Sequence, residues 1–177
     1  MTLLNSGQPV GGILQIGYTV ADIEKAMASY LDKMKIGPWF VRTIAPKQAL
    51  YRGKPTELRL TIALAFSGHV MHELIQQLND VPSVYRELID KRGYGFHHWG
   101  VPSTQFDRDC EAYCRRGFQV ALADTTPGSR VTYFDCPGDL PGMVEIIEMD
   151  EARERRYTKM YAESLAWDGS NPIRYES

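Results

Sequence analysis

The chain has 177 residues, of which 44% are hydrophobic, 11% aromatic and 24% charged. This length fits one domain, and the composition supports a sizeable buried core and excludes a disordered or fibrous protein. The formal net charge of −2 gives no indication of a nucleic-acid or anionic-membrane partner. Because no apolar stretch is long enough to span a bilayer and the N-terminal residues lack a signal-peptide pattern, we expect a cytoplasmic protein.

The N-terminal segment predicts a strand followed by a helix. Residues 13–20 are mostly apolar, as in a buried strand. Asp22 is placed to cap a helix, because the apolar residues after it recur at helical spacing until Gly37 and Pro38. A basic, turn-rich stretch then covers residues 42–55, and we interpret it as a solvated loop.

A hairpin and a short helix are predicted next. Residues 57–66 alternate between large apolar side chains and small or polar ones, which is typical of a strand. A Ser-Gly turn separates them from a second apolar strand at residues 70–76. Residues 82–92 carry a short apolar stripe and stop at Gly93, so we interpret them as a connecting helix.

After this connector the first pattern returns. Residues 96–101 predict a strand, and a helix begins near Phe106 and ends before Gly117. Two further strands are predicted at residues 131–135 and 143–149, on either side of a turn rich in proline and glycine. The order of elements therefore repeats that of the first half.

Residue-by-residue alignment supports an internal duplication. The matched pairs keep their order along both halves, and one offset applies to the first strands and another to the last strands. The difference between the offsets falls in the basic stretch, which is longer in the first half. At an offset of 83 the pairs are Gln15 with His98 and Gly17 with Gly100, and at an offset of 72 the pair is Glu73 with Glu145.

We therefore predict an α+β fold in which residues 1–177 form a single domain. Two tandem βαβββ modules, residues 13–77 and 95–149, form a curved mixed sheet around a metal-containing cavity. Residues 78–94 provide the connector helix, and residues 150–177 provide a C-terminal helix and tail.

The duplicated positions carry polar side chains where a strand otherwise requires apolar ones. Two carboxylates side by side in a protein interior are unfavourable unless a cation or protons compensate them. We predict that Gln15, Glu73, His98 and Glu145 converge and hold one divalent metal ion. His98 is preferred to His97 because its spacing to the following helix matches that of Gln15.

Four motifs resemble the vicinal oxygen chelate superfamily, which includes glyoxalase I, methylmalonyl-CoA epimerase, extradiol dioxygenases and fosfomycin-resistance proteins. The resemblance extends over residues 13–149 and implies the duplicated fold predicted above. The motifs are Gln15-Ile-Gly-Tyr-Thr-Val-Ala-Asp22, Glu73-Leu-Ile-Gln-Gln-Leu-Asn-Asp80, Gly95-Phe-His-His-Trp-Gly100 and Gly142-Met-Val-Glu-Ile-Ile-Glu148.

The resemblance is strongest to the glyoxalase I-like and methylmalonyl-CoA epimerase-like branch. The family's first ligand position usually holds His and here holds Gln15, as in mammalian-type glyoxalase I; epimerases carry His first and Gln second. Iron-based oxygen activation is disfavoured, because the dioxygenase branch needs two His ligands. A zinc ion fits this set best, and Mg, Mn, Co and Ni are alternatives.

The resemblance implies an enzyme that abstracts a proton next to a metal-bound carbonyl of a small substrate with neighbouring oxygens, as a lyase, isomerase or epimerase. Glu145, and second Glu73, are the candidate bases. Strand alternation predicts that Thr19, Arg59 and Thr61 share the ligand face, which makes them candidate substrate-binding residues. Two interpretations of Arg59 stay open, binding of a substrate carboxylate or phosphate and pairing with a nearby acid at the strand edge.

An alternative to the enzyme remains open, and the resemblance also bears on the assembly of the protein. The same cavity would suit a non-catalytic small-molecule-binding protein of the bleomycin-resistance type, although such proteins typically lack the metal ligands. A homodimer is a family expectation, since sheet edges and the C-terminal stripe offer surface for a second copy.

Overall fold

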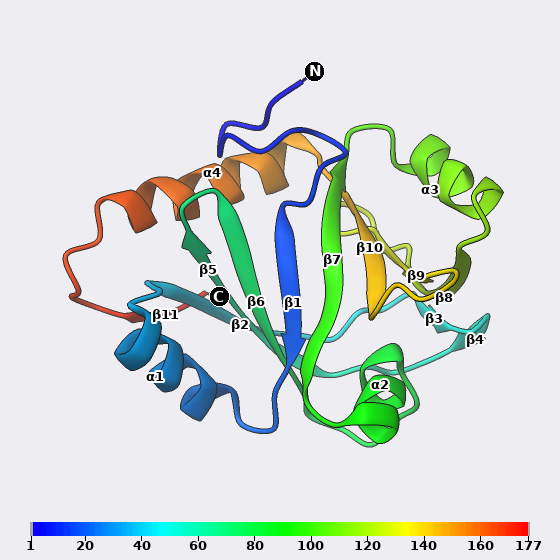
Figure 1. The fold of residues 1–177 in the computed structure, drawn as a ribbon, viewed down its shortest axis with the longest axis horizontal. Coiled ribbons are helices and arrows are strands. Elements are labelled where there is room, and N and C mark those ends of the chain that lie inside the picture. Colours follow the sequence, from blue (N-terminus) through cyan, green and yellow to red (C-terminus); the bar gives the residue numbers. More distant parts are fainter. Residues whose placement is uncertain (1, 177) are drawn as a thin grey trace.

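The computed structural model describes residues 2–176, which form one mixed eleven-stranded sheet with helices on both of its faces (Figure 1). The strand order is β11-β2-β5-β6-β1-β7-β10-β9-β8-β3-β4. The strands are β1 (Gln15–Thr19), β2 (Trp39–Ile44), β3 (Ala49–Tyr51), β4 (Lys54–Pro55), β5 (Leu60–Ser67), β6 (Val70–Gln77), β7 (Gly95–Ser103), β8 (Gln119–Asp124), β9 (Val131–Asp135), β10 (Met143–Glu148) and β11 (Ile173–Tyr175). The helices are α1 (Ile23–Met34), α2 (Val84–Arg92), α3 (Phe106–Arg115) and α4 (Glu151–Leu165).

The sheet contains the two predicted βαβββ modules. The first consists of β1, α1, β2, β5 and β6, and the second of β7, α3, β8, β9 and β10. They meet at the centre, where β1 and β7 are antiparallel, and each is flanked by the last strand of its own module in parallel orientation. This arrangement confirms the predicted duplication and α+β class. The extra length of the first module contains β3 and β4, and β3 crosses to pair with β8 of the second module.

The outer face of the first module is covered by α1. The carboxylate of Asp22 caps this helix by accepting a hydrogen bond from the backbone N–H of Lys25, as the sequence predicts. Met27 is fully buried and packs with Val41 and Ala63, which are neighbours on β2 and β5. The helix α3 covers the second module in the same way, with an apolar cluster around Phe106.

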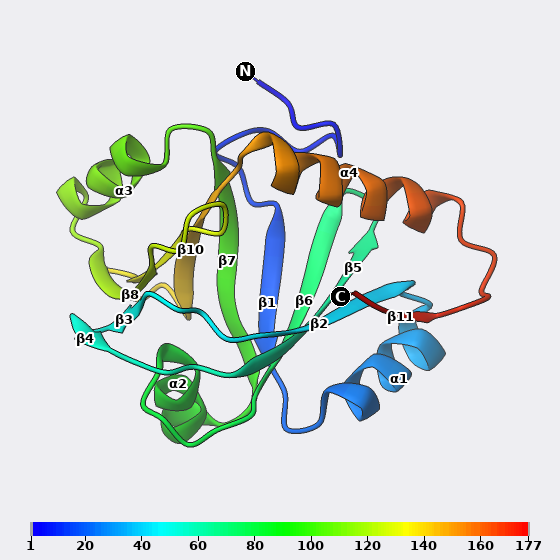
Figure 2. The same cartoon turned by 180° about the vertical axis from the view of Figure 1, so that it is seen from behind.

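The opposite face of β2 and β5 packs against the C-terminal helix. Phe40 and Leu64 alternate with the residues that contact α1, and they cluster with Tyr157 and Met160 of α4. Figure 2 shows α4 running across one end of β5 and β6, while α2 lies near the other end of the sheet. The sheet is therefore apolar on both faces, and the predicted C-terminal helix is confirmed.

The strands that sequence reasoning missed are β2, β3, β4, β8 and β11. The edge strand β11 follows α4 in the chain and pairs with β2 in parallel orientation. The stretch from residue 42 to 55 is not simply a solvated loop, because it includes the end of β2 and the β3–β4 hairpin. Its turn at Gly53 has a positive φ of 77°. Turn-forming residues of this kind made the whole segment resemble a loop, so the short strands on either side were not predicted.

Candidate metal centre

One half of the candidate site is a row of residues across the central strands. Gln15 of β1 is in register with Gly100 of β7, and Gly100 is in register with Glu145 of β10. Gly100 leaves no side chain between its neighbours, since a Cβ at this position would lie 2.8 Å from the Cβ of Gln15. The Gln15 amide and the Glu145 carboxylate consequently face the same interior space.

The other half is the equivalent row, with two residues from the first module and one from the second. Glu73 of β6 is in register with Gly17 of β1, and Gly17 with His98 of β7. A Cβ at Gly17 would overlap the His98 ring. Each row thus has one glycine between two polar side chains, which is the pseudo-twofold relation expected from the duplication.

The two rows meet at the Nε2 atom of His98. This nitrogen lies 3.2 Å from Oε2 of Glu145, 3.4 Å from Oε2 of Glu73 and 3.2 Å from Nε2 of Gln15. The Gln15 amide also donates a hydrogen bond of 2.7 Å to Oε2 of Glu73. All four residues are at most 8% exposed. The structure therefore brings together the four residues that the duplication singled out.

Burial makes the electrostatics of this cluster unfavourable for two free carboxylates. Burial, and then the charge of Glu145, raise the pKa of Glu73 to about 7. Burial alone would lower the pKa of His98, but its hydrogen bond to Glu145 and the charges of Glu145 and Glu73 outweigh this effect and raise it. Either protons or a bound cation would compensate the two carboxylates of this cluster.

His97 contacts His98 through the ring nitrogen that faces away from the carboxylates. The Nδ1 atoms of the two rings lie 3.0 Å apart, and Nε2 of His97 lies 3.3 Å from the carbonyl oxygen of Val84. Burial and the charge of His98 lower the pKa of His97 well below its ordinary value, so this ring is neutral. His97 is fully buried, and its ring packs beside Tyr85 and Tyr133.

The donor set fits a divalent cation. One ligand atom from each of Glu73, His98 and Glu145 lies within 4.8 Å of the others. Gln15 would present its carbonyl oxygen after a half-turn about its last side-chain bond. Buried carboxylates that are short of compensating charge are the groups a cation would stabilise, and one imidazole with oxygen donors suits zinc or a harder divalent ion.

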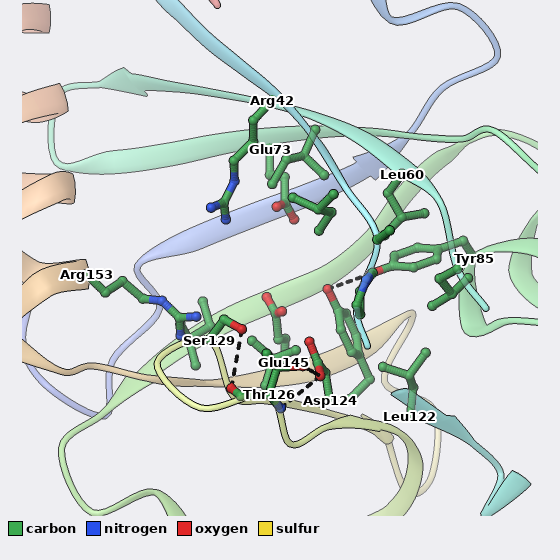
Figure 3. Close-up of a pocket in the computed structure, with 18 of the residues that line it drawn as sticks. Arg42, Leu60, Glu73, Tyr85, Leu122, Asp124, Thr126, Ser129, Glu145 and Arg153 are labelled. Carbon is green, nitrogen blue, oxygen red and sulfur yellow. Dashed lines mark hydrogen bonds between the residues drawn. The ribbon is translucent and has the colours of Figure 1, made fainter. Parts of the chain in front are cut away.

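A cavity of about 410 Å³ opens beside this cluster (Figure 3). Gln15, Glu73 and Glu145 form part of its wall, and Tyr85 donates a hydrogen bond of 3.0 Å to Tyr133 within it. The volume is within the range of small-molecule sites. The remaining wall is supplied by β2 and the β2–β3 connection, β5 and the residues before it, β8, β9 and their connection, and α4. It includes Arg42, Leu58, Leu60, Ile62, Leu122, Asp124, Ser129, Val131, Arg153 and Tyr157.

The structure does not bring the three predicted substrate-binding residues to this cavity. Arg59 is exposed before β5, with its N–H bonded to the side chain of Asn79. Thr61 lies on the other face of β5, where its hydroxyl contacts that of Thr43. Thr19 is buried at the end of β1, beyond the irregularity in the β1–β7 register.

The reason is that β5 carries apolar residues on both faces. Leu60 and Ile62 line the cavity, whereas Ala63 packs against α1. The alternation of residues 57–66 predicts a core face opposed to a ligand face. In the structure the large apolar side chains face the cavity, so Arg59 and Thr61 point away from it.

Sequence reasoning also missed residues that form the cavity wall. Arg42 lies at the start of the stretch interpreted above as a solvated loop, and Arg153 lies in the segment predicted only as a C-terminal helix and tail, but both line the cavity. The apolar run around Phe40 that ends at Ile44 was a usable signal for a strand with Arg42 on its inner face. No comparable signal marked Tyr85 on the connector helix.

The sequence between residues 14 and 134 matches the model of the Glyoxalase/Bleomycin resistance protein/Dioxygenase superfamily, and the chain belongs to this family. No curated protein sequence matches the chain. None of the helices within residues 2–176 combines the length and apolar character needed to cross a membrane.

Solved structures with a similar fold include methylmalonyl-CoA epimerases. The enzyme from Mycobacterium tuberculosis is 20% identical, with a TM-score of 0.56 over 86% of this chain and 93% of that chain. A variant of the Streptomyces coelicolor enzyme in complex with 2-nitronate-propionyl-CoA is 17% identical, with a TM-score of 0.56 over 81% and 97%. A hypothetical protein from Bacillus halodurans C-125 is 20% identical, with a TM-score of 0.57 over 79% and 95%. At these identities the likeness is one of fold.

Proposed function

We propose that this protein is a divalent-metal-dependent enzyme that removes and returns a proton on a carbon beside a substrate carbonyl, as a glyoxalase-like lyase, isomerase or epimerase. The observation that carries the proposal is the convergence of Gln15, Glu73, His98 and Glu145 at the wall of a small-molecule cavity. Membership of the glyoxalase superfamily and the fold of the epimerases support the same class of chemistry.

The four converging residues would hold the metal, and zinc is the ion we expect, with Mg, Mn, Co or Ni as alternatives. A bound divalent cation acts as a Lewis acid and lowers the pKa of a proton beside a carbonyl. The protein's own contribution is to bind the substrate between the carboxylates and to exclude water. The apolar side chains of Leu60, Ile62 and Val131 in the cavity wall serve this second purpose.

Glu145 is our first candidate for the base and Glu73 the second. Both carboxylates face the cavity, so either can take a proton from a substrate bound there and return it to the same or the adjacent carbon. In the metal-free protein burial and the charge of Glu145 raise the pKa of Glu73 to about 7, and a bound cation would lower this pKa and favour the ionised carboxylate that a base requires. A general base of this kind typically contributes about 10²–10⁴-fold to the rate.

The substrate we expect is a small molecule with two neighbouring oxygens. Structures with this fold include a methylmalonyl-CoA epimerase in complex with methylmalonyl-CoA, so an acyl-coenzyme A thioester is one candidate. Hemithioacetals of glutathione and small keto or hydroxy-keto acids are the others. We also expect a homodimer, because the sheet ends in the edge strands β11 and β4.

The experiment that tests the proposal is solvent proton exchange. Purified protein is analysed for metal content, loaded with zinc, and incubated in D2O with each candidate substrate while proton NMR follows loss of the signal beside the carbonyl. We expect exchange with at least one compound, loss of exchange on metal removal, and a decrease of about 10²-fold or more in Glu145→Gln. The matched control is Glu111→Gln, an exposed carboxylate on α3.

Two outcomes would count against the proposal. Glu145→Gln with full metal content and undiminished exchange would exclude Glu145 as the base. A protein that binds no divalent metal but binds small molecules without exchange would be the ligand-binding alternative of the bleomycin-resistance type.

A further inference from the structure

Two arginines from different elements point into the cavity beside the carboxylates. Arg42 comes from β2 and Arg153 from the first turns of α4, and they approach from the same side (Figure 3). Glu73 and Glu145 lie between this side and the opposite wall, where Leu60 is labelled. The cavity therefore has a cationic side, a central acidic cluster and an apolar side.

Arg42 forms no ion pair within 4 Å among residues 2–176, and the nearest opposite charge that acts on it is that of Glu73 in the acidic cluster. Its Nε is buried and makes no hydrogen bond, and none of the ion pairs of the described residues includes it. Burial and the charge of Arg156 lower the pKa of its guanidinium. A buried donor without a partner is unfavourable, so the native fold retains this group at a cost in stability.

Arg153 is held in place but is equally without a carboxylate partner in the described chain. Its Nη1 donates to the carbonyl oxygens of Glu148 and Arg130, at 2.6 and 3.2 Å, which leaves Nε and Nη2 free to donate. The neighbouring Arg156 differs, because Glu176 neutralises it at 2.5 Å. Two guanidiniums that present free donors to one space form a site suited to an oxyanion.

The opposite wall defines the other half of a ligand. Leu58, Leu60 and Leu122 are each about 2% exposed and line the cavity, and the ring of Tyr85 lies beside them. The three leucine side chains offer no hydrogen bond to a polar group. A ligand that fills the cavity would therefore bury an apolar portion here while its anionic end lies on the arginine side.

We propose that the cavity takes a small organic anion whose carboxylate or phosphate group is bound by Arg42 and Arg153 and whose apolar portion lies against Leu58, Leu60 and Leu122. The inference rests on the proposed function only in naming this anion as the substrate class. In that role the arginines hold one end of the substrate so that its reactive carbon lies beside Glu73 and Glu145.

The test is calorimetric titration with four probes. These are hexanoate, its neutral amide hexanamide, hexyl phosphate and inorganic phosphate, each titrated into protein with and without zinc. We expect hexanoate or hexyl phosphate to bind at least tenfold more tightly than hexanamide. Inorganic phosphate should bind at least tenfold more weakly than hexyl phosphate, because it lacks the apolar portion. The tighter of the two anions identifies the head group.

The variants connect this binding to the arginines. Arg42→Gln and Arg153→Gln should each weaken the preferred anion at least tenfold and leave hexanamide unchanged, whereas Arg42→Lys should retain part of the affinity. The matched control is Arg155→Gln on α4, whose side chain is 71% exposed. Equal binding of hexanoate, hexyl phosphate and hexanamide, or anion affinities unchanged in both glutamine variants, would overturn the inference.

Failure of the inference and failure of the proposed function are distinguishable. Arginine-dependent anion binding in a protein that binds no zinc would retain the inference and remove the metal-dependent reaction. Zinc binding and proton exchange, with anion affinities unchanged in Arg42→Gln and Arg153→Gln, would retain the metal-dependent reaction and remove the inference. If Arg42→Gln does not fold, the Arg42→Lys and Arg153→Gln titrations decide the outcome.

Discussion

The Nδ1 atoms of His97 and His98 lie 3.0 Å apart, and only one arrangement of protons is compatible with their surroundings. Nε2 of His97 faces the carbonyl oxygen of Val84, which can only accept, so this nitrogen carries the proton. Because His97 is neutral, its Nδ1 has a lone pair and accepts from Nδ1–H of His98. The remaining nitrogen of His98, Nε2, is thereby fixed toward Glu73 and Glu145.

His97 is consequently expected to position the imidazole ligand. Replacement by Phe in His97→Phe removes the acceptor for Nδ1–H of His98 but keeps an aromatic ring of similar size. We expect the zinc affinity to fall about 10–100-fold, as is usual when the partner of a ligating histidine is lost. Competition with a chromophoric chelator measures this change.

The control is His72→Ala, which removes a histidine next to Glu73 in sequence. His72 packs with Tyr18 and Tyr30. Zinc affinity should be unaffected in this variant. A wild-type zinc affinity in His97→Phe would show that the contact between the two rings has no role in the metal site.

The raised pKa of Glu73 predicts an unusual pH dependence of stability in the metal-free protein. The folded-state pKa is about 7 and the ordinary value is 4.5, so the folded state binds more protons between these values. The free energy of unfolding therefore falls as pH rises: the stabilisation is complete below pH 4.5 and is lost as pH passes 7. At about 1.4 kcal/mol per pKa unit this amounts to roughly 3 kcal/mol. The raised pKa of His98 acts in the same direction.

Urea unfolding at pH 5, 6, 7 and 8 in the presence of EDTA measures this effect. The variant Glu73→Gln has no carboxylate to titrate and should lose most of the decrease between pH 5 and 8. Glu111→Gln, an exposed carboxylate on α3, should retain it. A wild-type stability that is constant or rises over this range would contradict the electrostatic description of the site.

Metal binding should release the protons that the cluster takes up. A cation replaces the proton of Glu73 and that of Nε2 of His98, so apparent zinc affinity should increase with pH between 5.5 and 7.5. Calorimetric titration of zinc at pH 6.5 in two buffers with different ionisation enthalpies gives the number of protons released. We expect this number to decrease in Glu73→Gln. Zinc binding without proton release at pH 6.5 would contradict the prediction.

The four central residues could be predicted from the sequence because the duplication puts a polar residue at the same position in both halves. Gln15 and His98 share a position, and so do Glu73 and Glu145, so agreement between the halves identified polar residues that are buried. The same argument defined the modules, since periodicity and capping at Asp22 agreed with the repeat.

The cavity wall was not predictable by the same reasoning. Part of it is built from elements that the duplication does not repeat, namely the β2–β3 connection and α4 with Arg153. Alternation also fails where both faces of a strand are buried, because Leu60 and Ala63 then look equally like core residues. Only the position of α4 and the curvature of the sheet determine which apolar face borders a cavity.

The two duplicated glycines lead to a final prediction about the site. A Cβ at Gly17 would overlap the His98 ring, and one at Gly100 would lie 2.8 Å from the Cβ of Gln15. Gly17→Ala should therefore displace His98, lower the zinc affinity about 100-fold and reduce stability by about 1–3 kcal/mol through overpacking.

The loss in Gly17→Ala must be distinguished from simple destabilisation. Gly53→Ala provides the comparison, because Gly53 has a φ of 77° and an added Cβ there meets nothing within 4 Å. This substitution strains a turn outside the site and should lower stability by about 1 kcal/mol while zinc affinity stays at the wild-type value. Chelator competition and urea unfolding on both variants decide the matter. If Gly17→Ala bound zinc as tightly as Gly53→Ala, the side chain of His98 would not need the space that the glycine leaves. The close packing of the two rows would then not be required for metal binding.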